Sequence, residues 1–290
     1  MSNLQIDGKT TLCGLFGYPV AHSFSPAMHN AAFQALELNW IYLPLEVKPE
    51  QLGQAVDGLR AFNMAGVNVT VPHKEAVIPY LDKLDQGAAA IGAVNVIVNY
   101  EGKLTGYNTD GAGFTRALKE ETGFNPLHKK VVILGAGGAA RAVAVQLTLE
   151  GAKEIVLVNR TVPRAQALAQ TVERMGTPGR VLTWQEPQLA EAMSGADLVV
   201  QSTSIGMHPA VDYCPPVPQG VFRPGQLVCD LVYNPMETKF LSAAAKAGAT
   251  TVSGLGMLLY QGVLAFELWT GLDAPVEEMK KALYRQIGGK

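Results

Sequence analysis

The chain has 290 residues, of which 48% are hydrophobic and 17% are charged, and its formal net charge is −2. This composition excludes a disordered chain, and the length predicts two domains. A near-zero charge without a run of lysine or arginine disfavours nucleic-acid binding. The most apolar stretch, residues 255–266, is interrupted by Gln261 and is too short to cross a membrane, so it predicts a buried helix.

The cysteines and the N-terminal segment indicate a reduced, cytoplasmic protein. Residues 1–17 lack the positive flank, apolar core and cleavage site of a secretory signal. The three cysteines, Cys13, Cys214 and Cys229, are scattered and form no CxxC pair, which disfavours a disulfide framework and a zinc site. The five histidines also lack ligand spacing, so no metal is expected.

Short β-branched runs alternate with helical patterns along most of the chain, which is typical of parallel α/β architecture. In the first part we predict, in chain order, a strand over 11–17, a helix over 26–38, a strand over 40–47, a helix over 49–62, a strand over 66–71, a short helix after 73–77 and a hairpin over 93–108. The hairpin is expected to turn at Glu101-Gly102.

The composition changes near residue 110, where a connecting helix over 111–122 and a polar segment lead into a new strand. From there we predict a strand over 131–135, a helix over 137–152, a strand over 154–160, a helix over 163–175, strands over 196–203 and 225–233, and apolar helices from about residue 254 onwards. The proline-rich segment 208–224 is expected to be a surface loop.

The strongest local motif is VVILGAGGAARA, residues 131–142, in which a predicted strand runs directly into a G-x-G-x-x-A pattern that opens a helix. Such a turn permits close approach to a pyrophosphate, and the helix N-terminus offers N–H groups to the phosphates. A glycine-rich turn alone often only punctuates structure, but here the flanking strand and helix fit the fold. We therefore predict a dinucleotide site at Gly135, Ala136, Gly137, Gly138 and Ala139.

The end of the second strand indicates which dinucleotide binds. A chain specific for NAD usually has Asp or Glu about 20 residues after the glycines, whereas this chain has Asn159, Arg160 and Thr161, with Arg164 one helical turn later. Two guanidinium groups and a hydroxyl would bind a 2′-phosphate. The alternative is that both arginines are solvated surface charges. Cations are unfavourable at a helix N-terminus, however, so a bound anion explains them better, and NADP is favoured over NAD.

Further short motifs carry a resemblance when they are taken together. They are SFSP at 23–26, NVTVPHK at 68–74, GAVN at 92–95, GYNTDG at 106–111, GAGGAAR at 135–141, VNRT at 158–161, STSIGM at 202–207 and GLGMLLYQG at 254–262. No single motif is specific, but in this order and spacing the chain resembles the shikimate dehydrogenases from about Cys13 to Leu283. Gln201 stands where that family usually has Asn, a change expected to alter a local turn near the cofactor rather than the reaction.

The resemblance implies which residues bind a small cyclic carboxylic acid. Ser23 and Ser25 would bind its carboxylate, and Thr70, Asn95 and Gln261 would hydrogen-bond its ring hydroxyls. Taken alone, Ser23 could simply cap a helix, Thr70 could be a strand residue and Asn95 a turn residue. Gln261 differs, because an amide in an apolar helix requires a partner.

The resemblance also implies that Lys74 and Asp110 form the catalytic pair. Hydride transfer to a ketone builds negative charge on oxygen, which an ammonium can stabilise and then protonate. Which of the two is the formal acid stays open. Taken alone, Lys74 could be a solvated surface lysine and Asp110 a helix cap. Tyr233 would contact the substrate, and Gly254 and Met257 would line the nicotinamide.

The expected fold is α/β with two domains and a cleft between them. Residues 1–109 with 255–290 would form the substrate-binding catalytic domain, and residues 110–254 a Rossmann-type NADP-binding domain. The C-terminal helices would return to the first domain, with hinges near 108–112 and 252–256.

The resemblance implies reversible, NADP-dependent reduction of 3-dehydroshikimate to shikimate. The alternatives are a quinate or aminoshikimate dehydrogenase with relaxed cofactor use, and a regulatory module without catalysis, which would be expected to lose Lys74, Asp110 or the serines. The expected partner is the small-molecule substrate, and a homodimer is left open.

Overall fold

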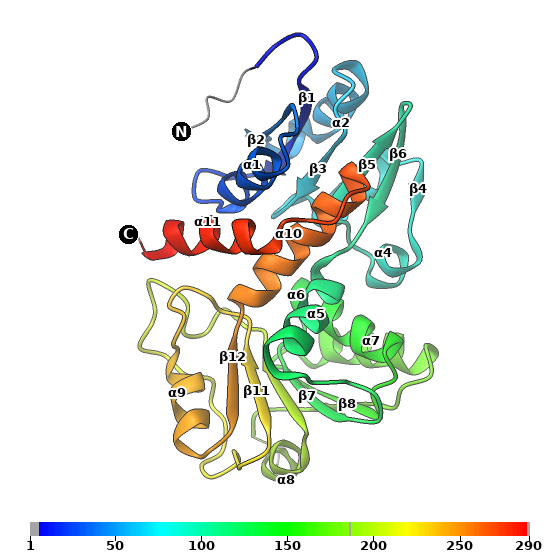
Figure 1. Ribbon diagram of the computed structural model, residues 1–290. Helices are drawn as coiled ribbons and strands as arrows, with labels where there is room; N and C mark the ends of the chain where they lie inside the picture. The colour runs from blue at the N-terminus through cyan, green and yellow to red at the C-terminus, as the bar shows by residue number, and fades with distance from the viewer. Residues whose placement is uncertain (1–5, 186, 289–290) are drawn as a thin grey trace. The chain divides into compact units, whose positions relative to one another are not determined.

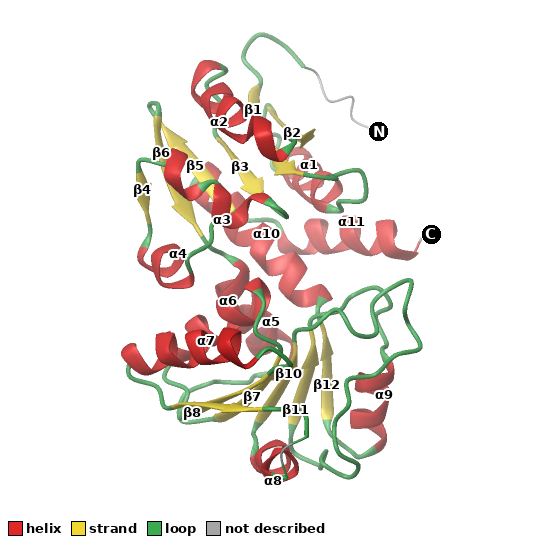
Figure 2. Ribbon diagram, turned by 180° about the vertical axis from the view of Figure 1, so that it is seen from behind, coloured by secondary structure: helices red, strands yellow, loops and turns green. Residues whose placement is uncertain are grey.

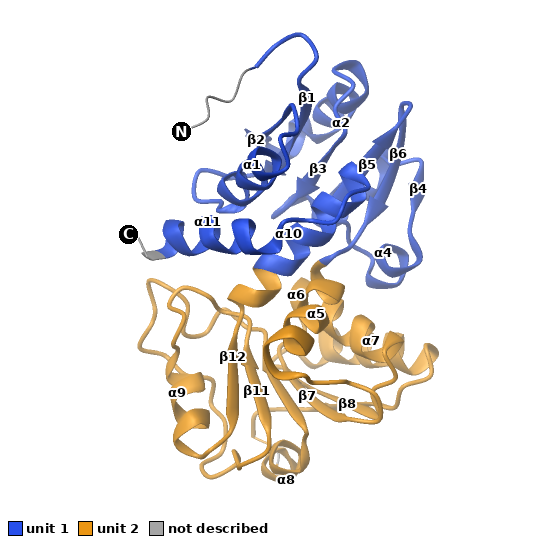
Figure 3. Ribbon diagram, viewed as in Figure 1, with its two compact units in different colours: residues 1–109, 259–290 blue, residues 110–258 orange. Residues whose placement is uncertain are grey.

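The computed structural model describes residues 6–185 and 187–288, and the chain divides into two compact units (Figures 1 and 3). Unit 1 consists of Met1–Thr109 and Leu259–Lys290, and unit 2 of Asp110–Leu258. The chain thus leaves unit 1 directly before Asp110 and returns to it at Leu259, within a long helix. No described helix combines the length and apolarity needed to cross a bilayer.

Unit 1 is built on a six-stranded sheet of order β2-β1-β3-β5-β6-β4. Its strands are β1 (Thr11–Gly17), β2 (Trp40–Glu46), β3 (Gly66–Val69), β4 (Lys83–Leu84), β5 (Val96–Tyr100) and β6 (Lys103–Tyr107). Strand β1 runs parallel to β2 and β3, whereas β5 is antiparallel to both β3 and β6. The predicted hairpin is confirmed, because Glu101 and Gly102 have φ values of 50° and 82°, as a tight turn between two strands requires.

Helices pack on this sheet from both ends of the chain. They are α1 (Ser25–Ala35), η1 (Pro49–Gln51), α2 (Leu52–Ala61), α3 (His73–Ala76), η2 (Ile78–Tyr80), α4 (Gln86–Ile91), the part of α10 (Leu255–Thr270) from Leu259 onwards, and α11 (Val276–Gly288). Helix α11 packs against α1, and the indole N–H of Trp269 donates to the Ile97 carbonyl at 3.0 Å. The last part of the chain therefore completes the core of unit 1.

Unit 2 has a wholly parallel sheet of order β12-β11-β10-β7-β8-β9. Its strands are β7 (Lys130–Leu134), β8 (Glu154–Val158), β9 (Gly179–Leu182), β10 (Leu198–Gln201), β11 (Leu227–Asp230) and β12 (Thr250–Ser253). Counted within the unit, the order is 3-2-1-4-5-6, which is that of a Rossmann fold. Such sheets bind nucleotides at the carboxyl ends of their strands, near the switch point that here lies between β7 and β10.

Helices cover both faces of this sheet (Figure 2). They are α5 (Asp110–Thr122), α6 (Gly138–Leu149), α7 (Val162–Arg174), α8 (Gln188–Gly195) and α9 (Lys239–Lys246). Along β7, Val131 and Ile133 pack with α5, α6 and α7, whereas Val132 and Leu134 pack with α8 and α9. Because successive strand residues point to opposite faces, the continuous apolar run of β7 supplies both cores. Residues 208–224 contain no helix or strand, as predicted.

Candidate functional site

One edge of the unit 1 sheet carries most of the residues predicted to bind the substrate. Strands β1, β3 and β6 end at this edge, and the antiparallel β5 begins there. Ser23 and Ser25 follow β1, Thr70 and Lys74 follow β3, and Asn95 directly precedes β5. The topology therefore gathers hydroxyl, amide and ammonium groups, which together suit a ligand that carries a carboxylate and hydroxyls.

The two serines lie at the beginning of α1. Ser25 is the first residue of the helix and is buried, and its N–H donates to Ser23 Oγ at 3.2 Å. The residue in the cap position is Phe24, whose side chain makes no cap hydrogen bond, so the bond from Ser25 is the contact that Ser23 Oγ makes with the helix start. The first turn of α1 thus combines serine hydroxyls with N–H groups of the kind that bind anions.

Lys74 lies on α3, whose backbone is held on both sides. The His73 N–H donates to the Thr70 carbonyl at 2.9 Å, and the Val94 N–H donates to the Lys74 carbonyl at 2.8 Å. The buried His73 places Nε2 at 2.7 Å from the Val47 carbonyl oxygen. Lys74 is half-buried, and the backbone hydrogen bonds fix the position from which its side chain extends.

Asn95 and Gln261 are joined by Thr109. Asn95 Oδ1 accepts from the Thr109 N–H at 2.7 Å, and Asn95 Nδ2 donates to Thr109 Oγ1 at 3.0 Å. Thr109 Oγ1 also donates to the backbone carbonyl of Gln261 at 3.0 Å. All three residues are buried. Two residues predicted to bind ring hydroxyls are thereby held by a residue that the sequence analysis did not select.

Beneath this edge lies a buried polar and aromatic cluster that was also missed. The Tyr42 hydroxyl donates to Asn68 Oδ1 at 2.8 Å, and Asn68 Nδ2 donates to the Asn95 carbonyl at 3.2 Å. The His29 ring stacks on Tyr42 with centroids 4.5 Å apart, and neither of its ring nitrogens has a hydrogen-bond partner among the described residues. Burial raises the pKa of Tyr42 and lowers the pKa of His29 to about 3. Asn68 could have been found, because an amide inside a buried strand requires partners.

In unit 2 the glycine-rich turn has the geometry that a dinucleotide needs. Gly135 has a φ of 116°, and a Cβ there would lie 2.6 Å from Ser202 Oγ, so only glycine fits. A Cβ at Gly137 or Gly138 would meet nothing within 4 Å, which leaves the backbone at the start of α6 open. No described side chain caps α6, and the fully buried Ala140 lets the helix pack closely on the sheet.

The two arginines lie at the next strand end, as expected. Arg160 and Arg164 are both exposed and form no ion pair within the described residues. Asn159 Nδ2 donates to the Thr161 carbonyl at 2.9 Å, which shapes the turn into α7. Thr161 occupies the cap position of α7 without a side-chain cap bond. Two cations beside an uncapped helix N-terminus suit a phosphate dianion.

The remaining predicted residues follow β11 and β12. Tyr233 follows β11 and is partly buried, and this burial raises its pKa. Gly254 follows β12, and a Cβ there would clash with the Leu231 carbonyl oxygen. Met257 packs against the core of unit 2. All three thus lie on the carboxyl-end side of the sheet, the same side as the glycine-rich turn.

Gln201 at the end of β10 organises the loop that follows it. Its Nε2 donates to the carbonyls of Thr203 and Ile205 at 3.1 and 3.0 Å, and its Oε1 accepts from the Thr203 N–H at 2.6 Å. The next residue, Ser202, donates its hydroxyl to the Leu134 carbonyl at 2.7 Å. The buried glutamine therefore fixes the loop that faces the turn at Gly135.

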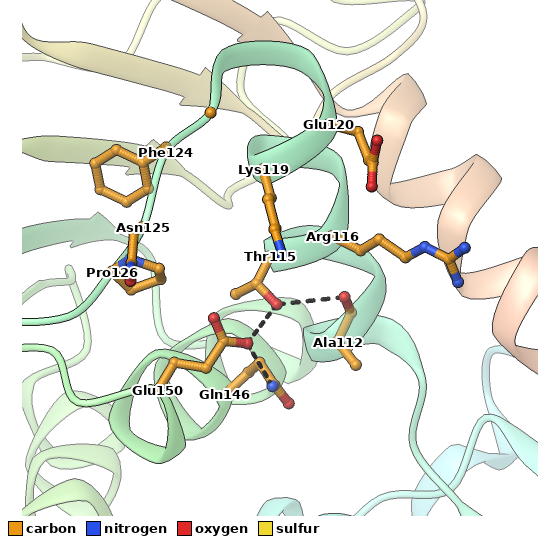
Figure 4. Close-up of a pocket in the computed structure, with 11 residues that line it drawn as sticks. Ala112, Thr115, Arg116, Lys119, Glu120, Phe124, Asn125, Pro126, Gln146 and Glu150 are labelled. Carbon is orange, nitrogen blue, oxygen red and sulfur yellow. Dashed lines mark hydrogen bonds between the residues drawn. The ribbon is translucent and has the colours of Figure 1, made fainter.

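A cavity of about 630 Å³ lies elsewhere in unit 2, between α5 and α6 (Figure 4). Three of its polar lining residues are bonded to one another: Thr115 Oγ1 donates to Glu150 Oε1 at 2.6 Å, and Gln146 Nε2 donates to the same oxygen at 2.7 Å. None of the residues predicted for the site lines this cavity. Among the described residues, no group of three or more potential ligands could hold a metal ion.

Comparison with known proteins places the whole chain in one family. A model described as the shikimate dehydrogenase substrate binding domain matches residues 15–97, a shikimate/quinate 5-dehydrogenase model matches 118–210, and a shikimate 5′-dehydrogenase C-terminal domain matches 254–284. A relative from Desulforamulus reducens, named shikimate dehydrogenase (NADP(+)), is 56% identical over 99% of both chains. Another with the same name from Methanopyrus kandleri is 51% identical over 98% of this chain and 99% of its own.

Solved structures agree with this result. The Listeria monocytogenes shikimate 5-dehydrogenase, in complex with shikimate and NAD, has a TM-score of 0.93 at 39% identity, covering 96% of this chain and 98% of that one. A 5-ketofructose reductase from Gluconobacter sp. is 38% identical with a TM-score of 0.89, covering 96% and 99%. The quinate dehydrogenase of Corynebacterium glutamicum, in complex with NAD, is 32% identical with a TM-score of 0.87, covering 95% and 99%. The residues at the two sheet edges and the matches along the full length lead to one conclusion, that the chain belongs to the shikimate dehydrogenase family.

Proposed function

We propose that this chain catalyses the reversible NADP-dependent reduction of 3-dehydroshikimate to shikimate. The observation that carries the proposal is 56% identity, over 99% of both chains, to a relative named shikimate dehydrogenase (NADP(+)). The geometry of each unit supports it independently, because unit 1 gathers groups for a hydroxylated carboxylic acid and unit 2 gathers groups for a phosphorylated dinucleotide.

The residues of unit 2 fit NADP. The pyrophosphate would lie against the open backbone of Gly137 and Gly138, where the uncapped N-terminus of α6 offers N–H donors. Arg160 and Arg164 would bind the 2′-phosphate, with Thr161 and Asn159 beside them. When bound, NADP supplies the nicotinamide that accepts or donates the hydride.

The residues of unit 1 would bind and orient the substrate. Ser23, Ser25 and the first turn of α1 would hold the carboxylate, and Thr70, Asn95 and Gln261 would accept or donate hydrogen bonds at the ring hydroxyls. Tyr233 is proposed to contact the substrate as well. A ring fixed at its carboxylate and at its hydroxyls can present only one carbon and one oxygen for reaction, which reduces the entropic part of the barrier.

Lys74 and Asp110 are proposed to handle the proton. As the carbonyl is reduced, the Lys74 ammonium would stabilise the developing alkoxide and give it a proton at that oxygen. In the oxidative direction the same oxygen would return the proton. Asp110 is proposed as the second member of the pair, which would titrate as a unit.

The second candidate is relaxed specificity, with activity on quinate or another polyhydroxylated substrate and with use of NAD as well as NADP. It is favoured by the fold neighbours named quinate dehydrogenase and 5-ketofructose reductase, and by the NAD bound in two of the solved relatives. The intact pair Ser23 and Ser25, and Arg160 in place of a carboxylate, favour shikimate and NADP instead.

The test is the absorbance of the reduced nicotinamide with shikimate and quinate, each offered with NADP⁺ and with NAD⁺. The proposal predicts rapid reduction of NADP⁺ by shikimate and little signal from the other three pairs. A dominant signal with quinate or NAD⁺ would leave the fold and the catalytic pair in place but contradict the assignment of specificity. No signal from protein that still binds NADP⁺ would contradict the activity itself.

We also propose a cytoplasmic location, which the three free cysteines support, because two of them are buried thiols of a kind that a reducing compartment preserves. The proposed partner is the small-molecule substrate. A homodimer stays a prediction, and sedimentation of the purified protein would test it.

A further inference from the structure

We propose that Thr109 is a positioning residue for the substrate, whose hydroxyl fixes Asn95 and Gln261 with respect to each other. The inference rests on the proposed function, because it gives those two residues the task of binding ring hydroxyls. Thr109 is the last residue of unit 1 before the chain enters α5 at Asp110. The printed hydrogen bonds of its side chain go to Asn95 and Gln261, so its effect on the substrate would pass through these two residues.

The bonds around Thr109 form a directed series. Asn95 Nδ2 donates to Thr109 Oγ1 at 3.0 Å, and the Thr109 hydroxyl donates to the backbone carbonyl of Gln261 at 3.0 Å, with Asn95 Oδ1 as a longer second acceptor at 3.3 Å. Because the hydroxyl accepts from one side and donates to the other, each bond strengthens the next in a poorly solvated site. The series joins the segment before β5 to the middle of α10, and its second bond links Thr109 to Gln261, which are 152 residues apart in the sequence.

The same residue also determines which way the Asn95 amide points. The Thr109 N–H donates to Asn95 Oδ1 at 2.7 Å, and Asn95 Nδ2 donates to Thr109 Oγ1. Both the oxygen and the nitrogen of the amide are therefore bonded to the same residue. Rotating the amide by 180° would oppose donor to donor at the backbone N–H. Thr109 is 5% exposed and Asn95 2%, so a rotated amide would leave poorly solvated groups without partners. The remaining amide hydrogen and lone pairs are thereby held in fixed directions.

The position of Thr109 in the chain adds a further constraint. Asp110, the proposed catalytic residue, follows it directly and begins α5. Two side-chain bonds and one backbone bond anchor Thr109, so the backbone that leads into Asp110 starts from a defined place. Loss of the hydroxyl should weaken the binding of the ring hydroxyls more than it disturbs the backbone before Asp110, because the bond from the Thr109 N–H to Asn95 would remain.

The experiment compares three variants with the wild type in steady-state assays with shikimate and NADP⁺. Thr109→Val replaces the hydroxyl by a methyl group of similar size, Thr109→Ala removes both branches without adding bulk, and Thr109→Ser keeps the hydroxyl. We expect the first two to raise the KM for shikimate roughly 5- to 30-fold, as the loss of a buried hydrogen bond implies. We expect Thr109→Ser to stay within about twofold of the wild type, and the dissociation constant of NADP⁺ to be unchanged in all three.

Thr115→Val is the matched control. Thr115 is likewise a buried threonine, 6% exposed, whose hydroxyl bonds to Glu150, but it lines the cavity between α5 and α6 (Figure 4). It should lower the melting temperature as Thr109→Val does and leave the KM for shikimate alone. The Ala variant keeps the test open if the Val variant does not fold.

The outcomes separate cleanly. A wild-type KM in Thr109→Val and Thr109→Ala would overturn the inference, and so would an equal rise in KM in Thr109→Ser, which would assign the role to the methyl group. A KM that rises in Thr115→Val as much as in Thr109→Val would assign the effect to lost stability. If the wild type itself fails to oxidise shikimate, the proposed function fails instead.

Discussion

Lys74 is the single residue on which the proposed chemistry depends most. Lys74→Ala should lower kcat for shikimate oxidation by roughly 10²- to 10⁴-fold, because general acid–base catalysis contributes about that much. NADP⁺ binding should be unchanged, since the glycine-rich turn belongs to unit 2. Initial rates and a fluorescence titration with NADPH would measure both quantities. Lys83→Ala, at an exposed lysine of the same unit, is the control, and turnover close to normal in Lys74→Ala would remove Lys74 from the mechanism.

Arg160 and Arg164 are proposed to determine the choice between NADP and NAD. Arg160→Ala and Arg164→Ala should each raise the dissociation constant of NADP⁺ roughly tenfold, the loss expected for a charge-assisted hydrogen bond, and leave that of NAD⁺ unchanged. Calorimetric titration with both cofactors would test this. Arg180→Ala, at an exposed arginine on β9 of the same sheet, is the matched control. Equal losses for NADP⁺ and NAD⁺ would show that the arginines do not recognise the 2′-phosphate.

At the scale of an element, the loop after β10 depends on one buried side chain. Gln201→Ala leaves the Thr203 N–H and two carbonyls without their partner, so it should lower the free energy of unfolding by about 1–3 kcal/mol and weaken NADP⁺ binding. Gln201→Asn introduces the residue that is usual in the family, and it should lower the free energy of unfolding and the affinity for NADP⁺ less than Gln201→Ala does. Denaturant unfolding and cofactor titration measure the two effects.

The control for this loop is a glutamine at the amino ends of the same parallel strands, on the side of the sheet opposite to Gln201. Gln226 precedes β11, is fully buried, and donates to the carbonyls of Met193 and Ala196 at 2.7 and 3.0 Å. Gln226→Ala should cost similar stability without changing cofactor affinity. If both variants weaken NADP⁺ equally, Gln201 acts through general stability and not through the loop.

The elements that the sequence predicted correctly have strong periodic patterns. The strand at Thr11–Gly17 and the hairpin turn at Glu101-Gly102 are as predicted. Those that were missed are short or weakly patterned: β4 has two residues, and β9, α8, α9 and β12 lie where polar loops and turns dilute the signal. Their structure depends on pairing with distant strands, which a local pattern cannot reveal.

The site was only partly predictable for a similar reason. Ser25, Asn95 and Lys74 stand in recognisable motifs, and the structure brings all three to one sheet edge. The bonds that hold this edge together were not predictable, because Thr109 meets Gln261 across 152 residues and Tyr42 meets Asn68 across 26. Sequence motifs indicate which groups do chemistry, whereas the supporting bonds follow from the topology.

At the scale of the molecule, two buried groups give stability opposite dependences on pH. The folded pKa of His29 is about 3, below its ordinary value of 6.5, so its contribution is present above pH 6.5 and is lost as pH falls towards 3. The folded pKa of Asp230 is raised by burial from 3.8 to about 6, so its contribution is present below pH 3.8 and is lost as pH rises through 6. Between about pH 6 and 4 the two slopes oppose each other.

Replacing each group by a side chain that does not titrate should reveal its contribution to the pH dependence of the unfolding free energy. Relative to the wild type, His29→Phe should gain up to about 1.4 kcal/mol of unfolding free energy per pH unit as pH falls from 6 to 4, and Asp230→Asn should lose a similar amount. Urea unfolding at pH 6, 5 and 4 measures the differences, in which all other groups cancel. A His29→Phe profile parallel to that of the wild type would show that His29 already takes up a proton in the folded protein.

The division of unit 1 between Met1–Thr109 and Leu259–Lys290 has a consequence for synthesis on the ribosome. The first segment emerges early but must wait, with its α1 face and the Ile97 carbonyl uncovered, until Trp269 and α11 are translated. Unit 2 is contiguous, so it is complete before the unit that was begun first. A nascent chain that stalls after residue 258 would carry every residue proposed for the 2′-phosphate, but it would lack Trp269 and α11 and could not complete unit 1.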